Sequence, residues 1–287
     1  MIWLWIPTLL WAFSFGIIKH FLQGIDPVEL AFVRLGLATL FFLPFIGKGG
    51  GWIVRLRYLM LGLLQFGLMY GCLFHSFRYL KGYEVALFTL MTPLYVICVN
   101  DFLERRISYL HWLAALLAVA GAAIIQYKGL NDPSWRGILW LQGSNLSFAT
   151  GQILYRRMQK GESAGYPDAF RVAWMYLGGT LLCAGWLLLS GDSSLGTVIR
   201  PDVPWEWLLY LGVVASGLGF FCWNRGARVV KNPGVLAVMN NAYIPLAILV
   251  NLGLFGEEAD MYRLIPGTVV LGLSLLLVWR IEHRPSR

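Results

Sequence analysis

The chain has 287 residues, of which 58% are hydrophobic and 13% are charged, and its mean hydropathy is +0.64. A soluble domain is about half apolar and one quarter charged, so this composition excludes an ordinary soluble fold and indicates a membrane protein. The formal net charge of +8 does not predict nucleic-acid binding, because the basic residues follow a membrane topology.

Ten apolar stretches are long enough to cross a bilayer, since about 20 helical residues span roughly 30 Å of hydrocarbon. In chain order they are residues 2–19, 27–46, 58–80, 84–103, 109–127, 136–156, 169–189, 206–226, 233–255 and 263–281. The first stretch lacks the basic start and the cleavage site of a signal peptide, so we expect it to be a retained helix. The sequence predicts an all-α membrane protein of ten transmembrane helices.

The last five spans repeat the first five. Pro27 aligns with Pro167 in the second span of each half, and Pro93 aligns with Pro245 in the fourth. Five is an odd number, so the second half enters the membrane from the opposite side. Two inverted five-helix repeats, at 1–130 and 131–287, are typical of secondary transporters that bind substrate near the bilayer midplane. A monomer is sufficient for such a site, and a dimer is possible.

Lys and Arg residues are distributed unequally between the two sides of the membrane. The connections on one side, together with the C-terminal segment, carry twice as many of them as the connections on the other side. The positive-inside rule places the richer side in the cytoplasm. Ten spans bring the N-terminus to the same side, so both termini are expected to be cytoplasmic.

Several short motifs resemble those of EamA-type drug/metabolite transporters, and together they extend over essentially the full length. They are Leu10-Trp11-Ala12-Phe13-Ser14-Phe15 with Lys19, Pro27 followed by Arg34, Pro93 with Glu104-Arg105, and Tyr155-Arg156-Arg157. The resemblance implies a ten-helix exporter of amino acids or related metabolites in the bacterial cytoplasmic (inner) membrane. It also implies a central cavity lined by the first, third, fourth, sixth, eighth and ninth helices.

Polar side chains lie on one face of the sixth span. Gln142, Asn145 and Gln152 follow helical spacing, and polar groups at this depth face protein or a water-filled path. One interpretation is a hydrogen-bonding wall of a cavity. Interhelical bonds that only hold the bundle together, at about 0.6 kcal/mol each, fit equally well.

A second polar group precedes the proline of the ninth span. Asn240, Asn241 and Tyr243 lie just before Pro245, and Thr92 directly precedes Pro93 in the fourth span. A proline in a helix leaves a backbone carbonyl without its donor. Such a break could contact substrate, or it could be a kink that improves helix packing.

Aromatic and polar residues on the first, third and eighth spans complete the predicted substrate-binding set: Trp11, Ser14, Gln65, Tyr70, His75 and Trp223. Aromatic rings beside amides and hydroxyls suit the apolar part of an amphiphilic substrate, although ordinary helix packing also accounts for single aromatic residues. His75 could couple protons to transport or bond to a neighbouring helix.

Two arginines fall inside predicted spans. Arg34 lies about two turns into its helix and could pair with a carboxylate such as Glu29, pair with backbone carbonyls, or bind a substrate carboxylate. Arg171 lies one turn from a helix end, where we expect it to extend towards the aqueous boundary.

The sequence contains no HExxH, P-loop, GxGD or GxSxG motif, and its four cysteines lack ligand-like spacing. We expect no catalytic residue, metal or cofactor, and the expected partners are a small-molecule substrate and the lipid bilayer. No carboxylate falls at mid-membrane, which favours a zwitterionic or neutral substrate over a cation. The predicted function is export of amino acids or related amphiphilic metabolites by alternating access. The alternatives are a non-transporting membrane scaffold and an intramembrane enzyme.

Overall fold

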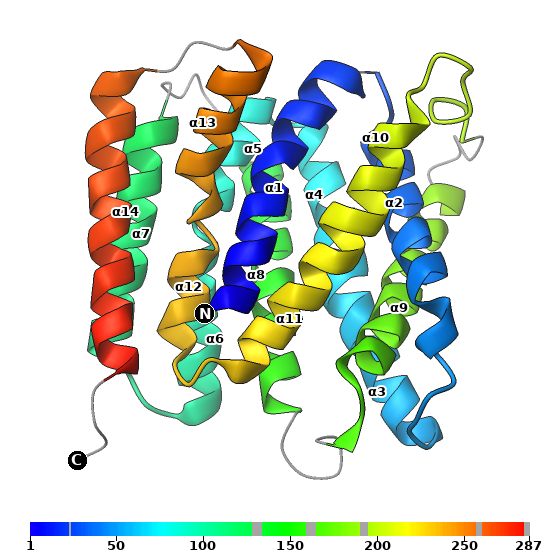
Figure 1. The fold of residues 1–287 in the computed structure, drawn as a ribbon, viewed down its shortest axis with the longest axis horizontal. Helices are drawn as coiled ribbons and strands as arrows, with labels where there is room; N and C mark the ends of the chain where they lie inside the picture. The colour runs from blue at the N-terminus through cyan, green and yellow to red at the C-terminus, as the bar shows by residue number, and fades with distance from the viewer. Residues whose placement is uncertain (23, 128–133, 159–164, 190–194, 257–259, 284–287) are drawn as a thin grey trace.

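The computed structural model describes residues 1–22, 24–127, 134–158, 165–189, 195–256 and 260–283. These residues form a bundle of helices, without a strand in the described ranges (Figure 1). The helices cross the bundle in alternating directions, as expected for a polytopic membrane protein.

The first half contains five helical spans. The first is α1 (Ile2–Phe21), and the second is α2 (Pro27–Phe42) with the short η1 (Leu43–Phe45). The third consists of α3 (Trp52–Gly62), the π-helical η2 (Leu63–Leu68) and α4 (Met69–Phe77). The fourth consists of α5 (Gly82–Thr89) and α6 (Thr92–Glu104), and the fifth is α7 (Tyr109–Gln126).

The second half repeats this order. It begins with α8 (Trp135–Arg157) and α9 (Asp168–Leu189). The next span consists of α10 (Trp205–Leu209), the π-helical η4 (Tyr210–Leu218) and α11 (Gly219–Val229). A broken span of α12 (Pro233–Met239) and α13 (Tyr243–Phe255) follows, and α14 (Met261–Glu282) ends the bundle.

Both halves carry the same two irregularities. A π-helical stretch interrupts the third span of each half, and a break interrupts the fourth span just before Pro93 and just before Pro245. A proline ring clashes with the carbonyl four residues earlier and cannot donate to it, which explains why the helices break at these positions. The two halves are therefore inverted structural repeats, as the sequence predicts.

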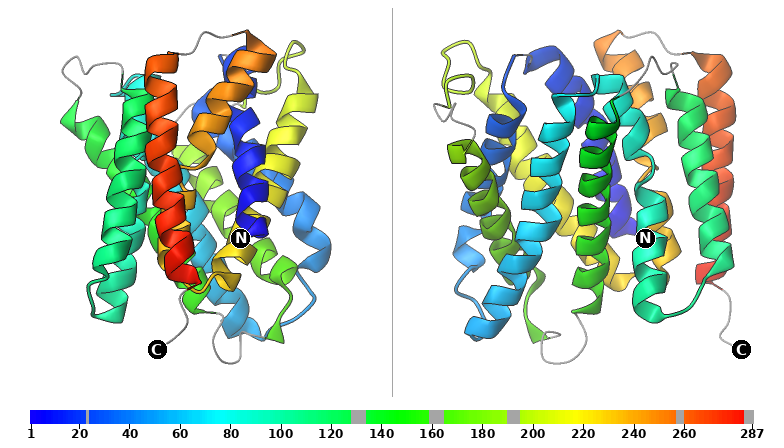
Figure 2. Two further views of the ribbon diagram at one scale, coloured as in Figure 1. Left: turned by 60° about the vertical axis from the view of Figure 1, so that its left-hand side comes forward. Right: turned by 180° about the vertical axis from the view of Figure 1, so that it is seen from behind.

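The sixth span differs from the others in composition. Nine helical segments of the described chain are long and apolar enough to cross a membrane, and α8 is not among them although it has 23 residues. Helix α8 contacts α4, α5, α6, α11 and η2, and the view from behind in Figure 2 shows it near the middle of the bundle. Its polar residues Ser144, Asn145 and Gln152 are accommodated because they are buried against these helices, whereas Leu139 and Leu146 on its other side are exposed.

Glycines permit the closest approaches between the two halves. A Cβ atom added to Gly62 would lie 1.9 Å from the Met175 carbonyl oxygen, and one added to Gly178 would lie 2.2 Å from the Leu59 carbonyl oxygen. Helices α7 and α14 cross in the same way at Gly121 and Gly267. Small residues allow membrane helices to approach at backbone distance, and here they do so where α3 crosses α9 and where α7 crosses α14, each a crossing between the two repeats.

The predicted span boundaries agree with the helices to within a few residues, with one exception. The third span begins at Trp52 rather than at residue 58. Arg55 and Arg57 suggested a connection, but the Arg55 Nε atom donates to the Gly50 carbonyl over 3.0 Å and its guanidinium lies 5.8 Å from the centre of the Trp174 ring. The first turns of α3 therefore hold their charges at the end of the bundle.

The two ends of the bundle differ in charge and in packing. One end, lowest in Figure 1, holds the connections α2–α3, α6–α7, α8–α9 and α11–α12. We call it the basic end, after Arg55, Arg57, Arg105, Arg106, Arg156, Arg157, Arg225, Arg228 and Lys231. At this end α6 packs against α12, whereas their counterparts α13 and α5, at the opposite end, make at most sparse contact.

Candidate substrate-binding site

An aromatic cluster joins the two halves. The indole N–H of Trp11 on α1 donates to the Ala215 carbonyl of η4 over 2.9 Å. Its ring centre lies 5.1 Å from that of Phe220 and 5.2 Å from that of Trp223. Phe66 of η2 and Phe148 of α8 also contact Phe220. We call Trp11, Phe66, Phe148, Phe220 and Trp223 the aromatic cluster. Two of its members, Trp11 and Trp223, were predicted as site residues.

Arg34 reaches towards this cluster from α2. Its Nε atom donates to the Ser216 hydroxyl over 3.0 Å, and its guanidinium lies 5.8 Å from the centre of the Tyr70 ring. The structure excludes the predicted pair with Glu29. The Glu29 carboxylate instead accepts from the Thr197 hydroxyl over 2.6 Å and from the Thr197 and Val198 backbone amides, which anchors the connection before α10 to α2.

A buried amide group lies where α8, η2 and α11 meet. Gln65 donates through Nε2 to Asn224 Oδ1 over 3.1 Å, and Trp223 donates through its indole N–H to Gln152 Oε1 over 3.1 Å. All four side chains are fully buried. Gln65 Oε1, Gln152 Nε2 and Asn224 Nδ2 have no partner among the described residues. The sequence indicated Gln65, and Asn224 was missed although an amide in the apolar span 206–226 was a usable signal.

A second amide group forms at the break in the fourth span. Asn145 and Gln142 of α8 bond to each other over 3.1 Å, and the Asn145 amide donates to the Phe88 carbonyl over 3.0 Å. Thr92 donates to Asn145 Oδ1 over 3.3 Å. The predicted face of α8 therefore meets the break at the Phe88 carbonyl, whereas the Thr89 carbonyl, four residues before Pro93, accepts from the Thr92 hydroxyl over 2.7 Å.

The residues around the second break have separate roles. Asn241 donates to the Leu90 carbonyl over 3.1 Å and to the Ala118 carbonyl over 3.4 Å, so it links the two broken spans. The Asn240 side chain bonds back to Leu236 within its own helix. Tyr243 is half-buried at the start of α13. Because the helix breaks at 240–242, Asn240 and Tyr243 do not lie on one continuous helical face.

Three other predicted residues lie in separate settings. The ring of His75 lies between those of Trp140 and Trp186, at 4.8 and 4.9 Å between centres, and its Nδ1 atom bonds to the Gly71 carbonyl. Ser14 bonds to Leu10 in its own helix. Tyr70 stacks on Phe74 and faces Arg34. Within the described residues, no hydrogen bond or ring contact joins His75 to Gln142, Asn145, Asn240 or Asn241, so a common cavity for the full predicted set stays a prediction.

Arg171 is fully buried and does not extend to the aqueous boundary as predicted. It pairs with Asp168 over 2.9 Å, and the same carboxylate accepts from Arg228 over 2.7 Å and from the Tyr155 hydroxyl over 3.3 Å. A buried guanidinium needs such a partner. The sequence did not predict this ion pair, because Asp168 and Arg171 lie on the first turn of α9, next to a connection.

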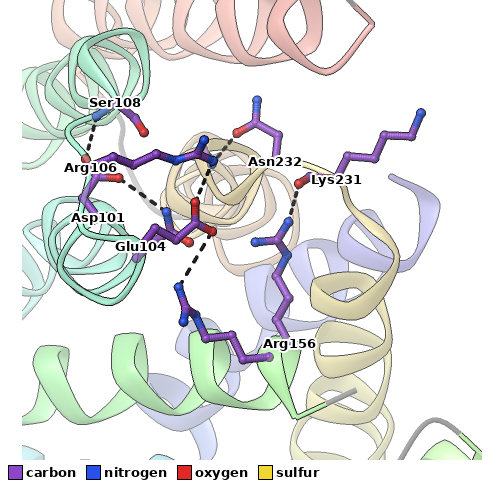
Figure 3. A network of polar contacts seen from close by, with 10 residues as sticks. Asp101, Glu104, Arg106, Ser108, Arg156, Lys231 and Asn232 are labelled. Carbon is purple, nitrogen blue, oxygen red and sulfur yellow. Dashed lines mark hydrogen bonds and ion pairs between the residues drawn. The ribbon is translucent and has the colours of Figure 1, made fainter. Parts of the chain in front are cut away.

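Polar contacts hold the basic end closed (Figure 3). Glu104 pairs with Arg106 over 2.6 Å and with Arg157 over 3.8 Å, linking the ends of α6 and α8. Arg156 donates to the Lys231 carbonyl just before α12. Asp101 accepts from the Ser108 backbone amide over 2.8 Å and from the Trp112 indole over 3.1 Å. These bonds connect α6, α7, α8 and α12 at one end of the molecule.

A hollow of about 990 Å³ lies beside the α6–α7 turn. Its walls include exposed apolar side chains, namely Phe102, Ile107 and Tyr109, and none of the predicted substrate-binding residues lines it. Asp101, Arg105 and Arg106 also line this hollow at the basic end, and no member of the aromatic cluster does, so we do not place the substrate there.

These features define a class, the multi-pass membrane transporters built from two inverted five-helix repeats. The chain belongs to the EamA-like transporter family, whose model matches residues 1–127 and 135–280. It is 40% identical over 274 residues to a "Biotin transporter" of Salmonella typhimurium, covering 94% of this chain and 90% of the relative. It is 39% identical over 285 residues to a "Probable biotin transporter" of Pseudomonas aeruginosa, covering 98% and 97%. A crystal structure of a protein with 18% sequence identity superposes with a TM-score of 0.79 over 99% of this chain and 98% of the other, which shows the shared fold.

Proposed function

We propose that this chain transports biotin across the bacterial cytoplasmic membrane. The observation that carries the proposal is the 40% identity, over 94% of the chain, with a protein named as a biotin transporter. We propose biotin in place of the amino acids that we expected from the sequence. The relatives whose names state a substrate are named as biotin transporters. Biotin is a small amphiphilic metabolite, as predicted, but its ionised carboxylate makes it an anion and not the zwitterionic or neutral substrate that we expected.

The chemistry of the central residues supports this substrate. Biotin combines a planar ureido ring, an apolar sulfur-containing ring and a five-carbon chain that ends in a carboxylate. The aromatic cluster offers apolar ring faces, and Gln142 and Asn145 offer amide donors and acceptors at a helix break. A few placed polar groups on a mostly apolar wall are typical of small-molecule sites.

We place the basic end in the cytoplasm, following the positive-inside rule. Contact between α6 and α12 at that end, with sparse contact between α5 and α13 at the other, supports a state closed to the cytoplasm. Transport would then proceed by movement of the two repeats about their glycine crossings, with the breaks in the fourth spans as hinges. One chain contains both repeats, so we propose the monomer as the transport unit.

Counterflow of labelled biotin in liposomes that contain the purified full chain tests this function. Saturable exchange of biotin, and none of aromatic or aliphatic amino acids, is the expected result, with protein-free liposomes as the control. Exchange of amino acids without biotin would restore the original expectation and contradict the proposal. No exchange of either class, with correctly folded protein, would favour the membrane-scaffold alternative.

A further inference from the structure

We propose that Arg34 binds the carboxylate of the transported molecule and thereby selects anionic substrates. This inference rests on the proposed biotin transport and deepens it, because it assigns one end of the substrate to one side chain. The argument depends on the charge, the contacts and the position of Arg34.

Arg34 carries a charge inside the membrane-spanning part of the bundle and has no carboxylate partner among the residues that the structure describes. It lies two turns into α2 and is half-buried. The two acidic residues nearest in sequence have other partners: Glu29 binds Thr197, and Asp26 caps the start of α2 by accepting from the Val28 amide. An ionised group at such a depth is costly and usually functional. Arg171 shows the contrast, because its charge is neutralised by Asp168.

The contacts of Arg34 orient its guanidinium and leave its outer edge free. The Ser216 hydroxyl holds Nε, and the Tyr70 ring lies beside the guanidinium. Nη1 and Nη2 have no hydrogen-bond partner among the described residues, and neither is enclosed by protein. These two nitrogens form the fork that binds a carboxylate through two parallel hydrogen bonds.

The position of Arg34 links this fork to the aromatic cluster. Arg34 binds Ser216, and Trp11 binds the preceding residue, Ala215, on the same π-helical stretch. The Tyr176 hydroxyl donates to the Ser216 carbonyl over 3.1 Å, which further fixes η4. π-Helical turns occur frequently at functional sites. A carboxylate on Arg34 would therefore lie next to half-buried Trp11, and the apolar chain attached to it could extend along the aromatic cluster.

The second repeat has no equivalent charge. The alignment of Pro27 with Pro167 pairs Arg34 with Trp174, whose indole N–H donates to the Ile46 carbonyl over 3.0 Å. A role in building the shared scaffold would favour similar residues at both positions. A charge in only one repeat instead agrees with recognition of one end of an asymmetric molecule.

The test compares biotin with biotin methyl ester, which differs only in its neutralised carboxyl group. Binding and counterflow are measured for the unaltered chain, Arg34→Gln and Arg34→Lys. Arg55→Gln is a matched control, because Arg55 also donates through Nε over 3.0 Å and also lies 5.8 Å from an aromatic ring, but at the basic end. Size-exclusion profiles and thermal unfolding verify that each variant folds.

Arg34→Gln is expected to weaken biotin binding by about 10- to 100-fold, the effect of losing hydrogen bonds to a charged group, and to change ester binding much less. Arg34→Lys should lose less, and Arg55→Gln should resemble the unaltered chain. Equal losses for biotin and ester, or normal biotin binding by a folded Arg34→Gln variant, would overturn this inference alone. No biotin binding by the unaltered chain would overturn the proposed function and the inference with it.

Discussion

The two repeats agree in backbone features and differ in chemistry. Both have a π-helical stretch in the third span, a break before a proline in the fourth and a glycine at each close crossing. In contrast, α8 is polar where its counterpart α1 is apolar, and Arg34 of the first half aligns with Trp174 of the second. The shared features build and bend the bundle, whereas the unshared residues surround the candidate site.

The two ends of the bundle show a related difference. Polar and charged contacts join the helices at the basic end, through Glu104, Arg106 and Arg156. At the opposite end α1 meets α13 through a stack of His20 on Phe255, with 4.7 Å between ring centres. Two inverted repeats with identical conformations would make both ends alike. The two repeats therefore differ in conformation in this structure.

The largest effect is expected where α3 of the first repeat crosses α9 of the second. Gly62→Leu and Gly178→Leu would each place a side chain against a backbone carbonyl, of Met175 and of Leu59. Backbone cannot yield as a flexible side chain can, so overpacking should exceed its usual cost of about 1–3 kcal/mol and prevent recovery of folded protein. The yield of monodisperse protein after size-exclusion chromatography measures this.

Gly36→Ala and Gly185→Ala are the controls, because a Cβ atom at either position has no neighbour within 4 Å. Both should give normal yields. If the Gly62 and Gly178 variants were as stable as these controls, the two repeats would not depend on their close crossing.

A large loss of stability that still permits recovery of folded protein is expected for Asp168→Asn in the second repeat. This change leaves Arg171 charged and fully buried, and it weakens the contacts of Arg228 and Tyr155. Breaking a buried ion pair typically costs about 3–5 kcal/mol. Thermal or denaturant unfolding in detergent should show this loss, and the double variant Asp168→Asn/Arg171→Met should recover part of it. An additive double variant would contradict the pairing.

An intermediate effect is expected where the two broken spans meet. Asn241→Leu removes the donor to the Leu90 and Ala118 carbonyls, and hydrogen bonds between membrane helices contribute about 0.6 kcal/mol on average and up to about 1.7. Thr89, at the related position of the first repeat, bonds only within its own helix to Val85. Thr89→Val should therefore be nearly neutral in the same unfolding measurement, and equal losses would contradict the asymmetry.

The sequence was sufficient for the features that follow from average composition and from proline. Spans, inversion and the two breaks could be predicted because hydrophobic length and a missing N–H act locally. The π-helical stretches, the Asp168–Arg171 pair and the contact of Arg34 with Ser216 could not, since each depends on which residues meet across helices far apart in the chain. The amides of α8 show the limit clearly. Their common face was predictable, whereas the Phe88 carbonyl as the partner of Asn145 was not.

The smallest effect is expected at the polar closure of the basic end. Glu104→Gln removes the ion pairs with Arg106 and Arg157, whose side chains are 71% and 36% exposed, so solvent screening limits their contribution to about 0.5 kcal/mol. If opening of this end limits exchange, the variant should exchange biotin about twofold faster, and high salt should reduce the difference from the unaltered chain. Asp202→Asn is the matched control, because it removes an exposed pair with Arg200 at the opposite end. An equal acceleration in both variants would show that the effect comes from surface charge in general and that the Glu104 contacts do not specifically hold the basic end closed.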